Sequence, residues 1–483
     1  MKILVVAAEI SPWAKVGGLA DVIGALPLAM ARAGAEVSIM VPGYSGLLDS
    51  LETESVAHES VRVGSEVESF ELLRASGPGG VPLFIVSHPG YFNRPGIYGD
   101  ARGDYPDNLR RYALFGRAAA MAAARHIRPD VIHAHDWHSS IAAIVSRADP
   151  DLRAALGGTA VALTIHNVAF QGMFPASDFQ ILNLDPSFFS INCLEFWGRM
   201  NLLKGAIMLA DGVSTVSPSY AAEISHDPEL SFGLDGVLRG KGHNFVGITN
   251  GADYDEWDPA KDKEIVASYS PSQRSGKRRC RTALRQALGL IDDPAIPVVG
   301  MVTRMVAQKG LDLLALALDA VVAQRVHLVI LGSGEPELER AFRQGEQRHS
   351  RNVRVRFAFD NALAHQIQAG SDIFLMPSRF EPCGLTQMYA CKYGTAPLVR
   401  ATGGLRDTIT EFNPKNGTGN GFVFTDYQPA ALVEALARAT HLFRQPAPWK
   451  RLMDNCFAAD FSWPYAAARY LEWFERLRYQ RGV

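Results

Sequence analysis

Apolar residues along the chain follow two spacings: short continuous runs, and stretches that repeat every three or four positions. Ile3 to Ala8 form the first continuous run, which is typical of a buried strand. Leu19 to Ala33 have helical spacing that ends before Gly34, and Val37 to Val41 form a second run. Because a strand, a helix and another strand follow one another, the opening predicts a parallel βαβ unit with a right-handed crossover.

The same alternation continues to near the end of the chain. Helices are predicted over Leu109 to His126, Leu311 to Val322 and, last in the chain, Tyr465 to Tyr479. The other predicted strands are Leu83 to Ser87, Val131 to Ala134, Ala160 to Ile165, Ala210 to Val216, Phe245 to Ile248, Pro297 to Val302, His327 to Leu331, Val353 to Phe359, Ile373 to Met376 and Ala396 to Arg400. Strands that alternate with helices indicate the α/β class with open parallel sheets.

A polar, turn-rich segment from Trp257 to Lys277 separates two halves of similar build. We therefore predict an N-terminal Rossmann-like domain over residues 1–253, and a linker with a C-terminal Rossmann-like domain over residues 254–460. The last segment, 461–483, is predicted to contain a helix that packs back on the first domain. The two parallel sheets would face each other across a central cleft.

Composition and charge narrow the class of protein. Of the 483 residues, 47% are hydrophobic and 20% are charged, which is ordinary for a globular protein. A chain of this length is too long to form a single core. A formal net charge of -2 gives no electrostatic case for nucleic acid or an anionic membrane. Five cysteines without a C-x-x-C pair favour neither a disulfide framework nor a zinc site.

The compartment is predicted from the apolar runs. No run approaches the ~20 residues that a membrane crossing needs. The first run is cut by Glu9, which fits a core strand better than a signal peptide. We therefore expect a cytoplasmic protein.

The stretch Met376 to Thr386 is predicted to be a strand-to-helix loop, because it follows the strand ending at Met376 and precedes helical spacing over Leu385 to Lys392. Ligands bind at such loops, and the following helix directs free backbone amides toward an anion. Glu381 places a carboxylate beside these amides, which suits a sugar hydroxyl next to a diphosphate. The alternative is that Glu381 only caps the helix.

Two other strand-to-helix loops carry cations. Lys15 precedes Gly17 and Gly18, whose exposed amides before a helix fit a phosphate-contacting turn, although neither a Walker A loop nor G-x-G-x-x-G is present. Arg304 and Lys309 bracket a loop of the second half, so two fixed cations can face one diphosphate. The alternatives are an ordinary turn and solvated basic residues.

Two further clusters of polar residues fit a structural role better than a metal site or a nucleic-acid site. The segment His133 to His138 contains three histidines and an aspartate, but its spacing is not that of H-x-H-x-D-H, and His133 also fits a core position. The basic run Lys277 to Arg279, with Arg281, opens a helix and is interpreted as a solvated helix face rather than a nucleic-acid patch.

Six motifs occur in a familiar order: Lys15-Val-Gly-Gly-Leu19, His133-Ala-His-Asp-Trp137, Thr164-Ile-His-Asn167, Gln308-Lys-Gly310, Pro377-Ser-Arg-Phe-Glu-Pro-Cys-Gly-Leu385 and Thr402-Gly-Gly-Leu405. With these motifs nearly the whole chain resembles the bacterial glycogen synthase and plant starch synthase family, two-domain glycosyltransferases of the GT-B fold. The resemblance implies transfer of glucose from ADP-glucose to the non-reducing end of an α-1,4-glucan (glycogen or maltodextrin), with retention of configuration and release of ADP.

The resemblance also implies roles for residues. Lys15, Arg304 and Lys309 would stabilise the leaving diphosphate, Glu381 would bind the glucose hydroxyls, and Asp136 and His166 would line the glucosyl and acceptor side. These six are the expected catalytic residues. The expected substrate-binding residues are Lys15, Gly17, Gly18, Asp21, Asn167, Asn250, Phe359, Cys383, Gly384, Leu385, Thr386, Gly403 and Gly404. No metal or other cofactor is expected, because cations and helix amides can stabilise the developing charge.

Retention would ordinarily suggest a nucleophilic carboxylate paired with an acid/base, but the sequence shows no convincing carboxylate pair. The resemblance instead implies same-face attack, in which a donor phosphate oxygen accepts the acceptor proton. Val16 and Phe359 depart from the Thr and Tyr that are common in the family, and Phe359 keeps a face for stacking on a base. Contacts from both halves imply that the domains close on the donor. The alternatives are a GT-B transferase that uses UDP-glucose or another acceptor, and a non-catalytic glucan-binding relative.

Overall fold

The computed structural model describes residues 1–100 and 102–482. The chain forms two compact units: unit 1 comprises Met1–Gly251 with the C-terminal segment from Trp463, and unit 2 comprises Ala252–Ser462. Each unit has its own parallel sheet and its own hydrophobic core. The predicted α/β class with two parallel-sheet domains is confirmed.

The large sheet of unit 1 has nine strands in the order β14-β13-β9-β8-β1-β2-β5-β4-β3. Neighbours pair in parallel, except that β4 is antiparallel to both β5 and β3. The strands are β1 (Lys2–Val6), β2 (Glu36–Pro42), β3 (Glu54–Val63), β4 (Glu66–Ser76), β5 (Pro82–Ser87), β8 (Val131–His135), β9 (Ala160–Ile165), β13 (Gly212–Thr215) and β14 (Phe245–Gly247). All six residues of β9 are buried, as expected for a strand covered on both faces.

The other elements of unit 1 surround this sheet. Two short antiparallel sheets pair β6 (Gly99–Asp100) with β7 (Gly103–Asp104), and β12 (Arg199–Asn201) with both β10 (Met173–Pro175) and β11 (Glu195–Phe196). The helices are α1 (Gly18–Arg32), α2 (Ser45–Leu48), α3 (Pro89–Phe92), α4 (Asn108–Ala122), α5 (Asp136–Ala148), α6 (Pro150–Ala155), α7 (Leu202–Leu209), α8 (Pro218–His226), α9 (Asp235–Gly240) and α18 (Trp463–Gln480). Short helical turns are η1 (Pro78–Gly80), η2 (Ala123–Ile127), η3 (Ala176–Leu182), η4 (Pro186–Phe188) and η5 (Gly242–Asn244).

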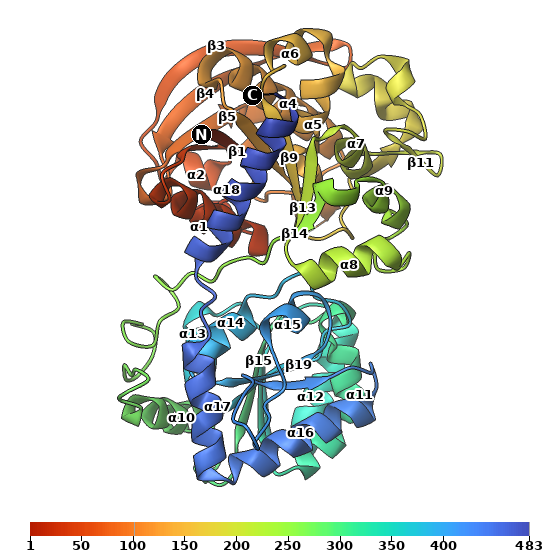
Figure 1. Ribbon diagram of the computed structural model, residues 1–483. Helices are drawn as coiled ribbons and strands as arrows, with labels where there is room; N and C mark the ends of the chain where they lie inside the picture. The colour runs from red at the N-terminus through yellow and green to blue at the C-terminus, as the bar shows by residue number, and fades with distance from the viewer. Residues whose placement is uncertain (101, 483) are drawn as a thin grey trace. The chain divides into compact units, whose positions relative to one another are not determined.

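The last helix of the chain, α18, packs in unit 1. Figure 1 shows it beside α1, the first helix, with which it is in contact. Tyr470, Phe474 and Leu477 of α18 are fully buried in the core of this unit. The two ends of the sequence therefore stabilise the same core.

Unit 2 contains a six-stranded parallel sheet in the order β17-β16-β15-β18-β19-β20. Its strands are β15 (Val298–Val302), β16 (His327–Leu331), β17 (Val353–Arg356), β18 (Ile373–Met376), β19 (Ala396–Arg400) and β20 (Phe422–Phe424). Its helices are α10 (Ser275–Ala287), η6 (Ala307–Lys309), α11 (Leu311–Ala323), α12 (Pro336–Arg348), α13 (Asn361–Gly370), α14 (Thr386–Lys392), α15 (Gly403–Thr408), α16 (Pro429–Phe443) and α17 (Pro446–Ala458). Because all strands are parallel, the loops that follow them share one edge.

Two predictions for unit 2 are wrong. The strand expected to reach Phe359 ends at Arg356, so Phe359 lies in the loop before α13 with 89% of its surface exposed. Lys277 does not lie on a solvated helix face. It is buried, and its ammonium donates to the carbonyls of Ala369 and Ser371 and to the hydroxyl of Thr395. Burial lowers the Lys277 pKa to about 8.

Among the described residues, no helix combines the length and apolar character that a membrane-spanning segment requires.

Candidate active site

The loop after β18 places Glu381 in a buried, paired position. Glu381 is 4% exposed, and the Lys309 ammonium contacts its two carboxylate oxygens at 2.7 and 2.9 Å. The Ser378 hydroxyl donates to the same carboxylate at 3.1 Å. Helix α14 begins at Thr386 with Leu385 as its N-cap, and this cap makes no side-chain hydrogen bond. The interpretation of Glu381 as only a helix cap is therefore wrong.

Close backbone contacts bring the sequence motifs of unit 2 together. Gly310 has a φ of 76°, and a Cβ there would lie 2.1 Å from the carbonyl oxygen of Pro377. Gly403 has a φ of 44°, and a Cβ there would lie 2.0 Å from the carbonyl oxygen of Glu381. Both positions need glycine because the loop after β18 passes directly against them. Three motifs that lie far apart in the sequence thus form one cluster around Glu381.

The other predicted residues of unit 2 lie on loops at the same edge of the sheet. Arg304 is exposed and follows β15, and the adjacent Met305 is hydrogen bonded through its backbone to Ser333 and Glu335. Phe359 lies on the loop that follows β17. Cys383, Gly384 and Leu385 precede α14, with Cys383 4% exposed.

Gln387 supports this loop and was missed by the sequence analysis. It is fully buried, and its amide nitrogen donates to the carbonyls of Cys383 and Gly384 at 3.1 and 3.0 Å. The same nitrogen contacts the Thr408 hydroxyl at 3.2 Å. A glutamine at a helix start carries no specific signal in the sequence, because its role depends on a loop that folds over it.

In unit 1, Lys15 lies on the loop between β1 and α1. Its ammonium contacts Asp21 at 2.6 Å, and the Lys15 side chain is 41% exposed, so the pair adds little stability and Lys15 stays accessible. The amides of Val16 and Gly17 both donate to one oxygen of Glu9, at 2.8 and 2.9 Å. The Gly17 amide is therefore engaged within the protein, contrary to the expectation that it is exposed for a phosphate.

Glu9 is a second residue that the sequence analysis missed as part of the site. It is 5% exposed, and its other oxygen accepts a hydrogen bond from the Tyr98 hydroxyl at 2.6 Å. The Tyr98 ring in turn stacks on His138, with ring centroids 4.3 Å apart. An acidic residue directly after a buried apolar strand was the available signal, because a buried carboxylate needs donors nearby.

The ends of β8 and β9 hold Asp136 and His166 together. The His166 backbone amide donates to Asp136 at 2.7 Å, and the ring of His166 is hydrogen bonded to that of His135 at 2.9 Å. Asp136 is the first residue of α5 and has a φ of 55°, an uncommon conformation for a residue with a Cβ. Such backbone strain is concentrated at functional sites.

Burial shifts the pKa values of the titratable side chains in this cluster. It raises the pKa of Asp136 to about 7, with a further contribution from the negative charge of Glu9. Burial lowers the pKa of His166 to about 3 and that of His135 well below its usual value, so both rings are neutral near pH 7. Glu9 and Asp136 therefore belong to one electrostatic cluster in unit 1.

The histidine-rich segment does not form a metal-binding group. His133 is fully buried, and its ring lies 5.0 Å from that of Phe474 and 5.3 Å from that of Tyr470, so it is a core histidine. Within residues 1–100 and 102–482, no group of three or more His, Cys, Asp or Glu side chains is placed to hold a metal ion.

Two asparagines complete the predicted set in unit 1. Asn167 follows β9 and accepts a hydrogen bond from the Ala169 amide at 3.0 Å. Asn250 follows β14 and is 7% exposed, and its side-chain oxygen has no hydrogen-bond partner among the described residues. A buried polar atom of this kind is a candidate for contact with a ligand.

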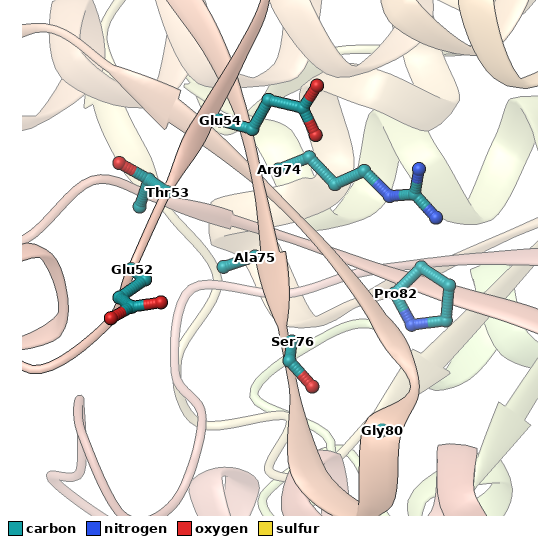
Figure 2. A pocket seen from close by; sticks show the side chains of 8 residues that line it. All are labelled: Glu52, Thr53, Glu54, Arg74, Ala75, Ser76, Gly80 and Pro82. Carbon is teal, nitrogen blue, oxygen red and sulfur yellow. The ribbon is translucent and has the colours of Figure 1, made fainter.

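A surface hollow of about 470 Å³ lies elsewhere in unit 1, at the ends of β3 and β4. Figure 2 shows the side chains that line it, among them Glu54 and Arg74 from these two paired strands. None of the predicted site residues lines this hollow. It is therefore separate from the candidate site.

Comparison with known proteins defines the class. Residues 2–240 match the family model "Starch synthase catalytic domain", and residues 281–450 match "Glycosyl transferases group 1". The chain is 33% identical, with a TM-score of 0.90 and 99% of both chains covered, to the catalytic domain of starch synthase IV from Arabidopsis thaliana bound to ADP and acarbose. A likeness to sucrose-phosphate synthase from Thermosynechococcus elongatus, at 17% identity, 99% coverage of both chains and a TM-score of 0.58, concerns the fold alone. The two units are thus those of a GT-B glycosyltransferase.

Curated relatives narrow the class further. The chain is 42% identical to a glycogen synthase of Geotalea daltonii over 485 residues, with 100% of both chains covered. It is also 42% identical to a glycogen synthase of Anaeromyxobacter sp. over 472 residues, which cover 97% of this chain and 98% of the relative. The chain belongs to the glycogen synthase and starch synthase family.

Replacement of Glu9 by Ala should loosen the loop that carries Lys15. We expect the free energy of unfolding to fall by about 1–3 kcal/mol, because two amides and one hydroxyl lose their acceptor. Hydrogen exchange followed by mass spectrometry should show faster exchange at residues 16 and 17, with α1 still protected. Tyr98→Phe removes only one of the three bonds and should leave both amides protected. Unchanged exchange in Glu9→Ala would contradict this role.

The raised pKa of Asp136 predicts a specific dependence of stability on pH. The folded protein holds this proton more tightly than the unfolded chain, so the stabilisation is complete below the unfolded pKa of about 3.9 and is lost as the pH rises through about 7. Thermal unfolding of the wild type and of Asp136→Asn, measured from pH 4 to pH 8, should show the wild type losing stability relative to the variant. Groups common to both proteins cancel in this difference. A constant difference would show that Asp136 is not desolvated.

Proposed function

We propose that this protein transfers glucose from ADP-glucose to the non-reducing end of an α-1,4-glucan and releases ADP. Three findings support the proposal. The chain aligns over its whole length with glycogen synthases. Its structural relative, starch synthase IV, was solved with ADP and acarbose. In unit 2 the Lys309 ammonium contacts the Glu381 carboxylate on loops that follow parallel strands, which is the edge where ligands generally bind in open α/β sheets.

The contact between Lys309 and Glu381 is the observation that carries the proposal. Lys309 is a cation 20% exposed, and its partner Glu381 is fixed by a second bond from Ser378. A donor diphosphate would compete with the carboxylate for the ammonium, which frees Glu381 to accept hydrogen bonds from the glucose hydroxyls. Arg304, which is exposed on the same loop after β15 as Lys309, would be a second cation for the diphosphate.

The remaining roles follow from position. In unit 2, Phe359 offers an exposed ring on which a base can stack, and the backbone around Cys383 to Thr386, with Gly403 and Gly404, would surround the sugar. In unit 1, Lys15 and Asp21 would serve the donor, while Asp136, His166, Asn167 and Asn250 would serve the glucosyl group and the acceptor.

In the proposed reaction the bond between the glucose C1 and the diphosphate oxygen breaks, and a bond from the acceptor O4 to C1 forms on the same face. The acceptor proton passes to an oxygen of the departing diphosphate, so no protein nucleophile is needed. Lys309 and Arg304 stabilise the charge that develops on the diphosphate, usually the largest contribution to catalysis. His166 is neutral near pH 7 and can accept or donate a hydrogen bond without adding charge.

The glycines of the Lys15 loop support close approach of a ligand. A Cβ at Gly17 or Gly18 would meet no atom within 4 Å, and neither residue has a positive φ. The fold therefore does not require glycine at these positions, unlike Gly310 and Gly403. A ligand that must approach the backbone would explain them.

Transfer of labelled glucose into precipitable glycogen tests the reaction, with ADP-glucose and UDP-glucose supplied separately and no metal added. We expect incorporation from ADP-glucose. Lys309→Ala should lower turnover by ~10²–10³-fold, since one charge that faces the transition state is lost. Lys415→Ala, an exposed lysine of the same unit, should have no effect. Incorporation from UDP-glucose alone would overturn the donor assignment, and incorporation from neither would overturn the reaction.

Because Lys309→Ala leaves a buried carboxylate without its cation, its stability must be followed as well. The double variant Lys309→Met with Glu381→Gln removes both charges and should fold with near-normal stability while remaining inactive. An active, folded double variant would show that neither side chain takes part in transfer.

Gly18→Ala separates the requirements of folding from those of ligand binding. Gly18 is the first residue of α1, so alanine should leave stability unchanged or raise it by up to ~1 kcal/mol. The added methyl group should raise the KM for ADP-glucose or lower turnover, together at least ~10-fold in kcat/KM. Gly240→Ala is the matched control, since its Cβ also meets no atom within 4 Å. Normal kcat/KM in Gly18→Ala would contradict contact with the substrate.

A further inference from the structure

A two-residue hairpin in unit 1 presents a tryptophan to solvent. Strands β11 and β12 pair through Phe196 and Arg199, so Trp197 and Gly198 form the whole turn. Trp197 is 76% exposed, among the largest exposures of any apolar side chain in the described part of the chain. Exposing so large an apolar surface to water is unfavourable. An aromatic side chain that is nevertheless exposed is a candidate for contact with a ligand.

The backbone of this turn is not one that tryptophan favours. Trp197 and Gly198 have φ values of 51° and 74°, as in a type I′ turn, whose first central position is normally Asn, Asp or Gly. A bulky residue at positive φ is strained. The turn itself therefore does not require a tryptophan at this position. The exposed indole ring must have another role.

The ring of Trp197 is held in a fixed place. It stacks on Phe196 with centroids 4.4 Å apart and an interplanar angle of 24°. On another side the backbone of Gly233 passes so close that a Cβ there would lie 2.5 Å from the indole ring. A ring supported in this way binds with little loss of side-chain entropy.

Neighbouring groups extend the exposed surface. Phe232 precedes Gly233 and is 42% exposed, with a φ of 51°, the same unfavourable conformation as Trp197. Ile191 is 75% exposed, and its carbonyl is bound by the buried Lys204, which also binds the carbonyl of Glu195 in β11. We call the exposed side chains of Ile191, Trp197 and Phe232, together with the buried Phe196 that stacks on Trp197, the hairpin platform.

The hairpin platform is tied to the acceptor side of the candidate site. Gln171 lies four residues after Asn167, and its side-chain amide nitrogen contacts the carbonyls of Ser231 and Phe232 at 3.4 Å. The side-chain amide of Asn201, the last residue of β12, donates to the side-chain oxygen of Gln171 at 2.7 Å. One buried amide network therefore fixes both the loop that follows β9 and the two segments that carry the aromatic rings.

We propose that the hairpin platform binds an outer chain of the glucan acceptor, away from the chain end that is extended; this inference rests on the proposed function. The C–H groups of a glucose ring form a flat apolar face that packs on an aromatic ring. The charged side chains of Glu195 and Arg199 flank the turn and can bind sugar hydroxyls. Four side chains cannot supply the ~800 Å² per partner of a stable protein interface, which favours a single polysaccharide chain as the ligand.

Native electrophoresis in gels that contain glycogen tests this proposal without turnover. The wild type should be retarded, and Trp197→Asn should raise the apparent dissociation constant for glycogen at least fivefold. Asn is a residue that the turn favours, so the variant should keep its melting temperature, and lost retardation cannot be ascribed to unfolding. Trp197→Phe keeps an aromatic face and should be intermediate. Tyr479→Asn, which removes an 84% exposed tyrosine of α18, should behave as the wild type.

Kinetics provide the second readout. In Trp197→Asn the KM for glycogen should rise several-fold, whereas the KM for ADP-glucose should not change. Equal retardation of the wild type and Trp197→Asn would overturn the proposal. So would a lower molecular mass of Trp197→Asn in gel filtration with unchanged retardation, because the hairpin platform would then join two copies of the chain. Retardation that depends on Trp197 in a protein that fails to transfer glucose would refute the proposed function but not the glucan site.

Discussion

The geometry of the loops in unit 2 depends on the burial of one carboxylate. Glu381 is almost inaccessible to water, and a charge in that position is stable only when a cation or several donors satisfy it. The Lys309 ammonium and the Ser378 hydroxyl both donate hydrogen bonds to this carboxylate, so the loop after β18 must lie against the loop after β15. The glycines at 310 and 403 then follow as a consequence, because only a residue without a Cβ can lie where these loops touch.

Unit 1 also contains a buried glutamate, but the partners of this carboxylate are uncharged. Glu9 is also a buried carboxylate at the end of a strand, but backbone amides and a tyrosine hydroxyl satisfy it instead of an ammonium. A carboxylate that holds amides fixes the backbone of a loop while leaving the side chain of Lys15 exposed. A carboxylate that holds an ammonium instead keeps a cation ready for exchange with another anion. Each unit therefore orders its loop with a glutamate, but only in unit 2 is the partner itself a catalytic candidate.

Much of the sheet architecture was predictable, because parallel strands covered on both faces must be continuous apolar runs. The bounds predicted for Ile373 to Met376 and for Ala396 to Arg400 are those of β18 and β19. The hairpin of β3 and β4 was not predicted, because β3 lies at the edge of the sheet and is mostly polar and exposed. Lys277 was misjudged because its acceptors lie 92 to 118 residues further along the chain. Glu9 was missed as a loop anchor for a similar reason: one of its donors, Tyr98, is 89 residues away. Spacing in a sequence reports local periodicity but not which distant groups meet.

Two pairs of glycines in this protein, Gly310 with Gly403 and Gly17 with Gly18, would be treated differently by evolution. Gly310 and Gly403 are needed for the chain to fold, so any descendant that keeps the fold must keep them whether or not it remains an enzyme. Gly17 and Gly18 have open space around them and an ordinary backbone, so a descendant released from catalysis could replace them without penalty. Among homologous chains, loss of the first-unit pair alongside retention of the second-unit pair would mark a protein that has become a pseudoenzyme while its architecture persists.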